Sequence, residues 1–312
     1  MISVIVPCYN EEENIVLFFE KSVNTLKDMD YEILFINDGS TDGTLSLLQN
    51  LYSEHKEHIS VISFSRNFGK EAAILSGLKN AKGDYVSIID ADLQQNPKLV
   101  LDMVEILENN PEYDAVAAYQ EKRIENKAMS GVKRLFYHLI NKVCEIELRA
   151  GASDFRTFRK SVVEAIISMP EYFRFSKGIF SWVGFETYYM PYVAEERNAG
   201  ESKWSVTRLI KYAIEGFISF TTFPLRIATY LGAFMSIISL VFIIMICIEK
   251  IFFSINVPGY PTLAVLILLI GGIQLLILGI IGEYLARIYI QGKNRPVYII
   301  KEYLRHNQSL KK

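Results

Sequence analysis

Short apolar runs alternate with longer amphipathic segments along the first two-thirds of the chain. The runs rich in β-branched and aromatic residues predict strands: Ile2–Pro7, Tyr31–Asp38, Ile59–Phe64, Asp84–Ile89 and Asp114–Tyr119. Between them, Glu11–Lys27 carries apolar side chains at helical spacing, and Asn67–Gly83 predicts a second helix that is closed by Gly83. Strands separated by such helices predict an α/β fold with a doubly wound, mostly parallel sheet.

The last third of the chain differs, because two long stretches in it carry no charged residue. Residues 227–248 and 262–282 are each long enough for a helix to cross a hydrocarbon core, which takes about 20 residues. The alternative is a pair of helices buried in a protein core. Both stretches are apolar on every face, so we expect two transmembrane helices joined by an extracytoplasmic loop over 249–261.

Basic residues flank this apolar pair on its outer sides. Those before the first stretch are Lys203, Arg208, Lys211 and Arg226, and those after the second are Arg287, Lys293 and Arg295. The connecting loop carries only Lys250. Since Lys and Arg concentrate in cytoplasmic flanks, we expect a plasma-membrane protein with two spans, whose polar two-thirds and both termini are cytoplasmic.

Residues 204–226 mix aromatic and aliphatic side chains with charged ones. This composition favours amphipathic helices that lie in the headgroup plane, although helices packed on the polar domain are the alternative. The expected organisation is therefore an α/β domain over 1–203, juxtamembrane helices over 204–226, transmembrane helices over 227–248 and 262–282, and a cytosolic tail over 283–312.

Composition narrows the class of protein. The 33 basic and 35 acidic residues give a net charge of −2, which argues against a protein that coats nucleic acid. The three cysteines, Cys8, Cys144 and Cys247, lie far apart and support neither a disulfide framework nor a zinc site. The pair His55 and His58 lies in a polar connector without further ligands. Neither a P-loop nor a dinucleotide-binding glycine motif occurs after the first strand.

Three polar clusters follow predicted strands: Pro7–Glu11, Asn37–Ser40 and Asp90–Asp92. Ligands of parallel sheets bind beyond the carboxyl ends of the strands, so these clusters are expected to share one edge. A second D-x-D, Asp28–Asp30, precedes a strand and belongs to the opposite edge. A D-x-D alone is a weak motif, and "DGSTDGT" is read equally well as a turn that caps the next helix.

Taken together, these segments resemble the family 2 glycosyltransferases, which have a GT-A fold. The resemblance is carried by "VIVPCYNEEENI", "INDGSTDGT", "SRNFGKEAAILSGLKNAKGDYVSIIDADLQQNP" and "AGASDFRTFRKSVVEAI". Three later motifs, "WVGF", "ERNAGESKWSVTRLIKYAIEGFISFTTFPLRIATYLG" and "GEYLARIYIQGKNRPVY", resemble the subgroup with two C-terminal spans. That subgroup comprises the polyprenyl-phosphate glycosyltransferases related to dolichol-phosphate mannose synthase and bactoprenol glucosyltransferases. The resemblance covers nearly the whole chain.

The resemblance implies a set of site residues. Those that would bind the nucleotide sugar are Pro7, Tyr9, Glu11, Asp38, Lys70, Asp90, Arg197, Ser202 and Lys203. A divalent cation, Mg²⁺ or Mn²⁺, would be held by Asp90, Asp92 and Gln94. The acceptor phosphate would be bound by Arg123, Lys133, Arg134 and Arg156, and the catalytic residues would be Asp92, Asp154 and Arg156.

The chain departs from the family pattern at three positions near the expected acceptor site. Relatives commonly have arginine near Gln120, aspartate at Ala150 and another arginine near Ser153. We expect the basic residues between 123 and 134 to compensate for these losses. The surplus of Arg and Lys over residues 123–160 suits the acceptor phosphate, and the alternative is that this stretch is a helix with a solvated basic face.

The resemblance implies an inverting transfer of a hexose or N-acetylhexosamine from a nucleotide diphosphate sugar to undecaprenyl or another polyprenyl phosphate, for modification of a cell-envelope glycan. The expected donor is UDP-linked. A phosphate monoester, with a second pKa of about 6, is mostly dianionic at neutral pH and needs little help from a base. We therefore expect Asp154 mainly to orient Arg156 and the acceptor, although the family role is usually written as base.

Two other interpretations remain. A processive polysaccharide synthase shares the first motifs, but it would carry more spans and a Q-x-x-R-W signature, and no Arg-Trp pair occurs in this chain. A membrane-anchored nucleotide-sugar-binding protein with a decayed catalytic site is disfavoured by the retained residues Asp90, Asp92, Gln94, Asp154 and Arg156. The identity of the sugar is not predicted, and a homo-oligomer and a monomer both stay open.

Overall fold

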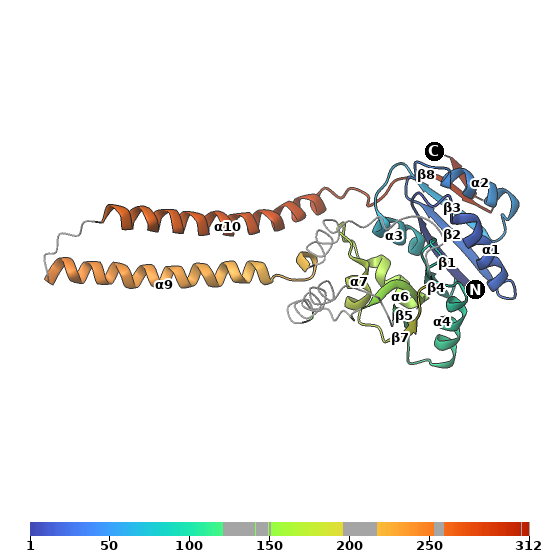
Figure 1. Cartoon of the computed structure of the whole chain (residues 1–312), viewed down its shortest axis with the longest axis horizontal. Coiled ribbons are helices and arrows are strands. Elements are labelled where there is room, and N and C mark those ends of the chain that lie inside the picture. The colour runs from blue at the N-terminus through green and yellow to red at the C-terminus, as the bar shows by residue number, and fades with distance from the viewer. Residues whose placement is uncertain are drawn as a thin grey trace. The chain divides into compact units, whose positions relative to one another are not determined.

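The computed structural model describes residues 1–120, 141, 149, 151–195, 217–252, 259–306 and 308–311 (Figure 1). The chain forms two compact units. One comprises Met1–Gly216 together with Arg295–Lys312, and the other comprises Phe217–Asn294. The first unit therefore contains both ends of the chain.

Four parallel strands form the centre of the first unit, in the order β4-β1-β2-β3. They are β1 (Ile2–Cys8), β2 (Tyr31–Asn37), β3 (Ile59–Phe64) and β4 (Tyr85–Ile88). Their side chains are buried almost throughout, because helices cover both faces of the sheet. The predicted α/β fold with a parallel core is confirmed, and every predicted strand is present.

Further strands extend the sheet on both sides and make it mixed. In the described part of the chain it has nine strands, in the order β7-β5-β6-β4-β1-β2-β3-β8-β9. The outer strands are β5 (Ala115–Gln120), β6 (Ala152–Arg159), β7 (Thr187–Tyr192), β8 (Ile300–Arg305) and β9 (Gln308–Lys311). Strand β6 runs antiparallel between β4 and β5, and β8 runs antiparallel beside β3.

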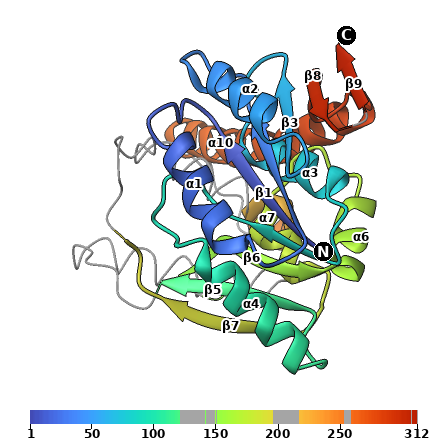
Figure 2. The same cartoon turned by 90° about the vertical axis from the view of Figure 1, so that its right-hand side faces the viewer.

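The helices of the first unit form two layers (Figure 2). On one face lie α1 (Ile15–Leu26), α2 (Thr44–Glu54) and α4 (Lys98–Asn109). On the other face lie α3 (Lys70–Asn80) and α6 (Lys160–Ser168). Helix α7 (Ser176–Trp182) contacts β6. Alternate residues of β1 serve the two layers. Val4 and Val6 belong to the core cluster under α1, whereas Ile5 faces Gly77 of α3.

Two predicted helix boundaries were wrong. The first helix begins at Ile15 rather than Glu11, and the second spans only Lys70–Asn80 of the predicted 67–83. In both cases the residues before the helix use their polar groups in loop contacts. Gly69, directly before α3, has a φ of 98°, which is incompatible with continuing the helix backwards.

The C-terminal segment differs from the expected tail over 283–312. The chain continues as helix to Gly292, and β8 and β9 then add to the edge of the sheet beside β3 (Figure 2). The ring of Tyr298 stacks on Phe64 with 4.9 Å between the centroids, and the amide of Ser65 donates to the carbonyl of Ile299 at 3.0 Å. The C-terminal segment is thus part of the first unit's sheet.

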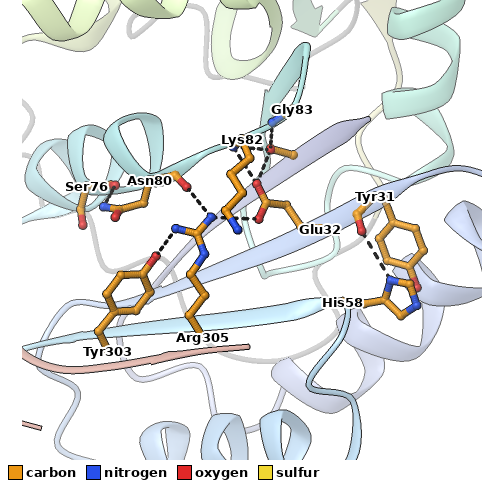
Figure 3. A network of polar contacts seen from close by, with 10 residues as sticks. Tyr31, Glu32, His58, Ser76, Asn80, Lys82, Gly83, Tyr303 and Arg305 are labelled. Carbon is orange, nitrogen blue, oxygen red and sulfur yellow. Dashed lines mark hydrogen bonds and ion pairs between the residues drawn. The ribbon is translucent and has the colours of Figure 1, made fainter. Parts of the chain in front are cut away.

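Polar contacts anchor this segment at the edge of the sheet where the central parallel strands begin (Figure 3). Nη2 of Arg305 lies 3.6 Å from Oε2 of Glu32, and Nη1 donates to the Tyr303 hydroxyl at 2.8 Å. Oε1 of Glu32 accepts from the Ser3 hydroxyl at 2.6 Å and from the Lys82 amide at 2.7 Å. Burial raises the pKa of Glu32, which the Ser3 hydrogen bond and the Arg305 charge oppose.

The second unit contains two long helices, α9 (Phe223–Phe252) and α10 (Tyr260–Gly292), which lie side by side (Figure 1). Both are long and apolar enough to cross a membrane, over Phe223–Phe242 and Leu269–Gly292. The stretches predicted as spans, 227–248 and 262–282, lie inside these helices. Of the predicted juxtamembrane segment 204–226, residues 204–216 lie outside the described residues and the last four residues begin α9.

Candidate active site

The carboxyl ends of the four central strands meet at one edge of the sheet. The strands end at Cys8, Asn37, Phe64 and Ile88, and each of the predicted polar clusters follows one of these ends. Asp30, from the other D-x-D, precedes β2 and lies 4.0 Å from the N-terminal ammonium at the opposite edge. The position of the strands thus separates the two D-x-D motifs as predicted.

The loop after β1 and the loop after β2 hold each other by hydrogen bonds. The Asn10 amide donates to the Ser40 hydroxyl at 3.0 Å, and Oδ1 of Asn10 accepts from the Thr41 amide at 2.9 Å. Oε2 of Glu12 accepts from the Gly43 amide at 2.6 Å. The motif "DGSTDGT" is therefore a structured turn that braces the loop containing Tyr9 and Glu11.

Asp38 fixes the next loop. Its carboxylate is buried and accepts the main-chain amides of Phe68 at 2.6 Å and Gly69 at 2.9 Å, one on each oxygen. Burial raises the pKa of Asp38, and these amides oppose the rise. Gly39 has a φ of 64°, and a Cβ there would lie 2.3 Å from the carbonyl carbon of Arg66. These contacts set where α3 begins, and hence where Lys70 lies.

Lys70 joins two carboxylates at the centre of this edge. Its Nζ lies 2.6 Å from Oδ1 of Asp90 and 3.1 Å from Oδ2 of Asp154. The register of β4 and β6 explains the meeting: Ile88 pairs with Arg156 in antiparallel strands, so two residues further on Asp90 comes opposite Asp154. Residues separated by more than sixty positions in the sequence thus form one charged cluster.

The charges in this cluster hold one another ionised. Burial lowers the pKa of Lys70, but the attraction of Asp90 and Asp154 outweighs it and leaves that pKa raised. Burial raises the pKa of Asp154, but the attraction of Lys70 and Lys177 outweighs it and lowers the pKa to about 2. The second oxygen of Asp154, Oδ1, is buried and has no hydrogen-bond partner in the described part of the chain.

Arg156 lies beside this cluster with its guanidinium buried. Its Nε donates to the carbonyl of Ser153 at 3.3 Å, and its Cζ lies 5.1 Å from the centroid of the Phe180 ring. Burial lowers the pKa of Arg156, but arginine keeps its charge in proteins. Asp154 is ion-paired with Lys70, and it also attracts the charge of Arg156.

Arg149 is a basic residue that the sequence analysis included in the basic stretch 123–160 but did not single out. It is exposed, and its guanidinium lies between two rings, with 4.6 Å from Cζ to the centroid of Tyr119 and 4.6 Å to that of Tyr189. Lys177 of α7, which attracts Asp154, was missed as well. The sequence signals for Arg149 were its place in the basic stretch 123–160 and its closeness to "SDFR". Its two tyrosine partners could not be predicted, because they come from β5 and β7.

The residues predicted to hold a cation form a tight turn after β4. Oδ1 of Asp92 accepts the Gln94 amide at 3.2 Å, and Leu93 between them has a φ of 60°. Among the described residues, no group of three or more His, Cys, Asp or Glu side chains could hold a metal ion. Mg²⁺ is commonly held by one or two carboxylates plus substrate phosphates, so Asp92 and Gln94 suit a cation that arrives with a diphosphate.

Only some of the remaining predicted site residues lie in the described part of the chain. Pro7 belongs to β1, Tyr9 follows it with a partly exposed ring, and Oε2 of Glu11 accepts from the Asn14 side chain at 2.8 Å. The departures at Gln120 and Ser153 lie at the adjoining ends of β5 and β6. The residues that lie outside the described part of the chain are Arg123, Lys133, Arg134, Ala150, Arg197, Ser202 and Lys203.

Known proteins match this chain along most of its length. The sequence profile of "Glycosyl transferase family 2" matches residues 3–167. CsbB of Bacillus subtilis strain 168 is 42% identical over 304 residues, which cover 97% of this chain and 92% of that protein. The SfII prophage-derived bactoprenol glucosyl transferase of Shigella flexneri is 41% identical over 308 residues, which cover 98% of this chain and 99% of that protein.

Among solved structures, mannosyltransferase PcManGT from Pyrobaculum calidifontis, in complex with GDP-Man and Mn²⁺, is similar at 20% identity and a TM-score of 0.46. The match covers 70% of this chain and 63% of that chain. The profile spans all four central strands and the Lys70–Asp90–Asp154 cluster, and the Bacillus and Shigella relatives continue through both apolar helices. The predicted resemblance is confirmed: the chain belongs to glycosyl transferase family 2.

Proposed function

We propose that this protein transfers a hexose or N-acetylhexosamine from a nucleotide diphosphate sugar, expected to be UDP-linked, to a polyprenyl phosphate such as undecaprenyl phosphate. The observation that carries the proposal is the cluster in which Lys70 joins Asp90 to Asp154 beside the Asp92–Gln94 turn. Similarity along the whole chain to bactoprenol glucosyl transferases, whose name specifies a lipid acceptor and a glucosyl group, supports the substrate class.

On the donor side, Asp92 and Gln94 would hold Mg²⁺ or Mn²⁺, which when bound stabilises the charge on the departing nucleoside diphosphate. Lys70 adds a cation that can reach the same diphosphate from the start of α3. The loops braced by Ser40 and Asp38 would position the nucleoside against Tyr9 and Glu11. An inverting transfer needs only one direct displacement at the anomeric carbon, so no covalent glycosyl-enzyme is required.

On the acceptor side, the site must accommodate a second anion. Arg156 supplies a buried cation, and Arg149 supplies an exposed one held between Tyr119 and Tyr189. A phosphate with a second pKa of about 6 attacks as the dianion at neutral pH. Asp154 then needs only to keep the acceptor oriented, and the dianion needs no proton transfer to its carboxylate.

A lipid acceptor requires that the protein meet a membrane, and the two apolar helices supply the means. The C-terminal strand β8 pairs with β3 in the same sheet as β1, so the chain must return to the side from which it left. If α9 and α10 both cross the membrane, the chain leaves through one helix and comes back through the other. This supports two spans with both termini on one side, which the flanking basic residues favour as the cytoplasmic side.

The test is an assay on the purified full-length protein with undecaprenyl phosphate and a panel of radiolabelled sugar nucleotides. We expect one sugar nucleotide to yield labelled lipid that extracts into butanol, in a reaction that needs Mg²⁺ or Mn²⁺ and stops with EDTA. Asp92→Asn is the matched inactive control. Labelled polymer in place of lipid would favour a processive synthase, and binding of the sugar nucleotide without turnover would favour a decayed enzyme.

A further inference from the structure

We infer that Lys70 acts as an internal counter-cation in the donor-free enzyme, occupying Asp90 and so keeping the divalent cation from binding there until the nucleotide diphosphate arrives. The inference rests on the proposed function and gives it an order of events. Its basis is the position of one ammonium, 2.6 Å from a predicted metal ligand and 3.1 Å from Asp154.

The backbone around Lys70 is fixed from both sides. Before it, Asp38 holds the amides of Phe68 and Gly69. After it, the carboxylate of Glu71 accepts the amide and the hydroxyl of Ser176 at the start of α7. The helix end therefore cannot shift easily, and any rearrangement falls to the side chain of Lys70. A lysine has a flexible four-carbon stem and three donors that can change partners.

The charges at the site make binding of the ammonium and a metal ion to Asp90 mutually unfavourable. Lys70 neutralises two carboxylates that would otherwise repel each other across β4 and β6. A divalent cation at Asp90 would bring two further positive charges next to the ammonium without any new anion. Binding of the metal alone is therefore disfavoured while Lys70 keeps its present partners.

A diphosphate removes this conflict because it brings acceptors for both cations. Its oxygens would complete the coordination of a metal held by Asp92 and Gln94, and they would offer Lys70 a new anionic partner. When Lys70 turns to the diphosphate, Asp154 loses its ion pair and is left facing the acceptor side. Donor and metal binding would thus leave the Asp154 carboxylate available to orient Arg156 and the acceptor before the lipid phosphate reacts.

The experiment measures Mn²⁺ binding by electron paramagnetic resonance on full-length protein in detergent, with and without UDP. We expect weak Mn²⁺ binding to the unmodified protein without UDP and a strong increase when UDP is added. In Lys70→Met, Mn²⁺ binding without UDP should tighten about tenfold, within the usual range of coupling between two ligands, and the effect of UDP should shrink. Lys79→Met, an exposed change on the same helix, should leave both values unchanged.

A second variant guards against loss of fold. Lys70→Met leaves Asp90 and Asp154 unshielded, so the double variant Lys70→Met/Asp154→Asn removes their repulsion and should still bind Mn²⁺ more tightly without UDP. Equal Mn²⁺ affinity of unmodified and both variant proteins without UDP would overturn the inference, as would tight UDP-independent binding to the unmodified protein. Absence of sugar transfer in the lipid assay would instead count against the proposed function, whatever the Mn²⁺ result.

Discussion

Asp154 and Lys70 form an ion pair inside the site, with 3.1 Å between Oδ2 and Nζ. The pair joins β6 to the start of α3. Burial alone raises the pKa of Asp154, but the attraction of Lys70 and Lys177 lowers it to about 2. A carboxylate that holds its proton so weakly is a poor general base at neutral pH.

We predict that Asp154→Asn lowers the transfer rate by about tenfold, well below the ~10²–10⁴-fold that a general base contributes. Asparagine keeps the shape of the side chain but loses the charge that holds Lys70. Asp92→Asn should abolish nearly all activity, since it removes the carboxylate expected to hold the cation. Measured kcat values for the two variants decide the matter. Complete loss in both, with the Asp154→Asn defect relieved by raising the pH, would show that Asp154 is the base.

The pH profile gives an independent check. Because the pKa of Asp154 is lowered, its ionised form stabilises the fold at pH values above 3.8, the ordinary pKa of the group. This stabilisation is lost as the pH falls toward 2. Asp154 is therefore ionised at neutral pH while it is paired with Lys70. We expect kcat/KM for the acceptor to fall below about pH 6, where the phosphate gains a proton. The same acid limb should persist in Asp154→Asn, and its disappearance in that variant would contradict this assignment.

Arg149 offers a prediction about the acceptor. Stacking between Tyr119 and Tyr189 uses the faces of the guanidinium and leaves its N–H edge for an anion. We expect Arg149→Gln to raise KM for the lipid phosphate about tenfold, as loss of one charge-assisted hydrogen bond allows, with little change in donor KM. Lys98→Gln, an exposed change on α4, is the control. A change in donor KM alone would place Arg149 on the nucleotide side.

Gly39 tests the link between Asp38 and Lys70. A Cβ at this position would lie 2.3 Å from the carbonyl carbon of Arg66, and the φ of 64° is itself unfavourable for alanine. We expect Gly39→Ala to cost about 1–3 kcal/mol of stability and to lower activity, because the 65–69 loop must shift. Gly232→Ala in α9, where a Cβ meets no atom within 4 Å, should not destabilise the protein in thermal unfolding, since alanine favours a helix interior over glycine. Full activity of Gly39→Ala would show that the loop position is not critical.

The parallel core and the edge that carries the site could be predicted because both follow from local pattern. A buried parallel strand is a continuous apolar run, and the polar residues that end it lie at the carboxyl edge whatever the rest of the chain does. That reasoning placed Asp38, Asp90 and Asp92 at one edge and Asp28 and Asp30 at the other. The strands that carry them are confirmed.

The partners of these residues could not be predicted, because they depend on pairing between distant segments. Asp90 and Asp154 lie opposite each other because of the register of β4 against β6. Strand β6 lacks the apolar run that would predict a strand. The C-terminal strand β8 is short and half charged, and only its pairing with β3 makes it part of the sheet. For the same reason the contact between Arg305 and Glu32 could not be predicted.

The loss of stability caused by removing the Arg305 charge should depend on pH. Arg305 lies 3.6 Å from Glu32, and both side chains are largely buried. Burial already raises the pKa of Glu32, with Arg305 opposing. Without Arg305 the pKa should rise further, so the protonated form is favoured and stability is lost as the pH rises through that pKa.

We therefore expect Arg305→Met to destabilise the protein by about 1–3 kcal/mol at pH 8 and by clearly less at pH 5, as judged by thermal unfolding at each pH. Lys301→Met on the same strand is exposed and should show no such dependence. Activity should survive at temperatures below unfolding, since the contact is at the opposite edge from Lys70. Equal loss at both pH values would mean that Arg305 acts through packing of its stem on β8, and that its charge does not offset Glu32.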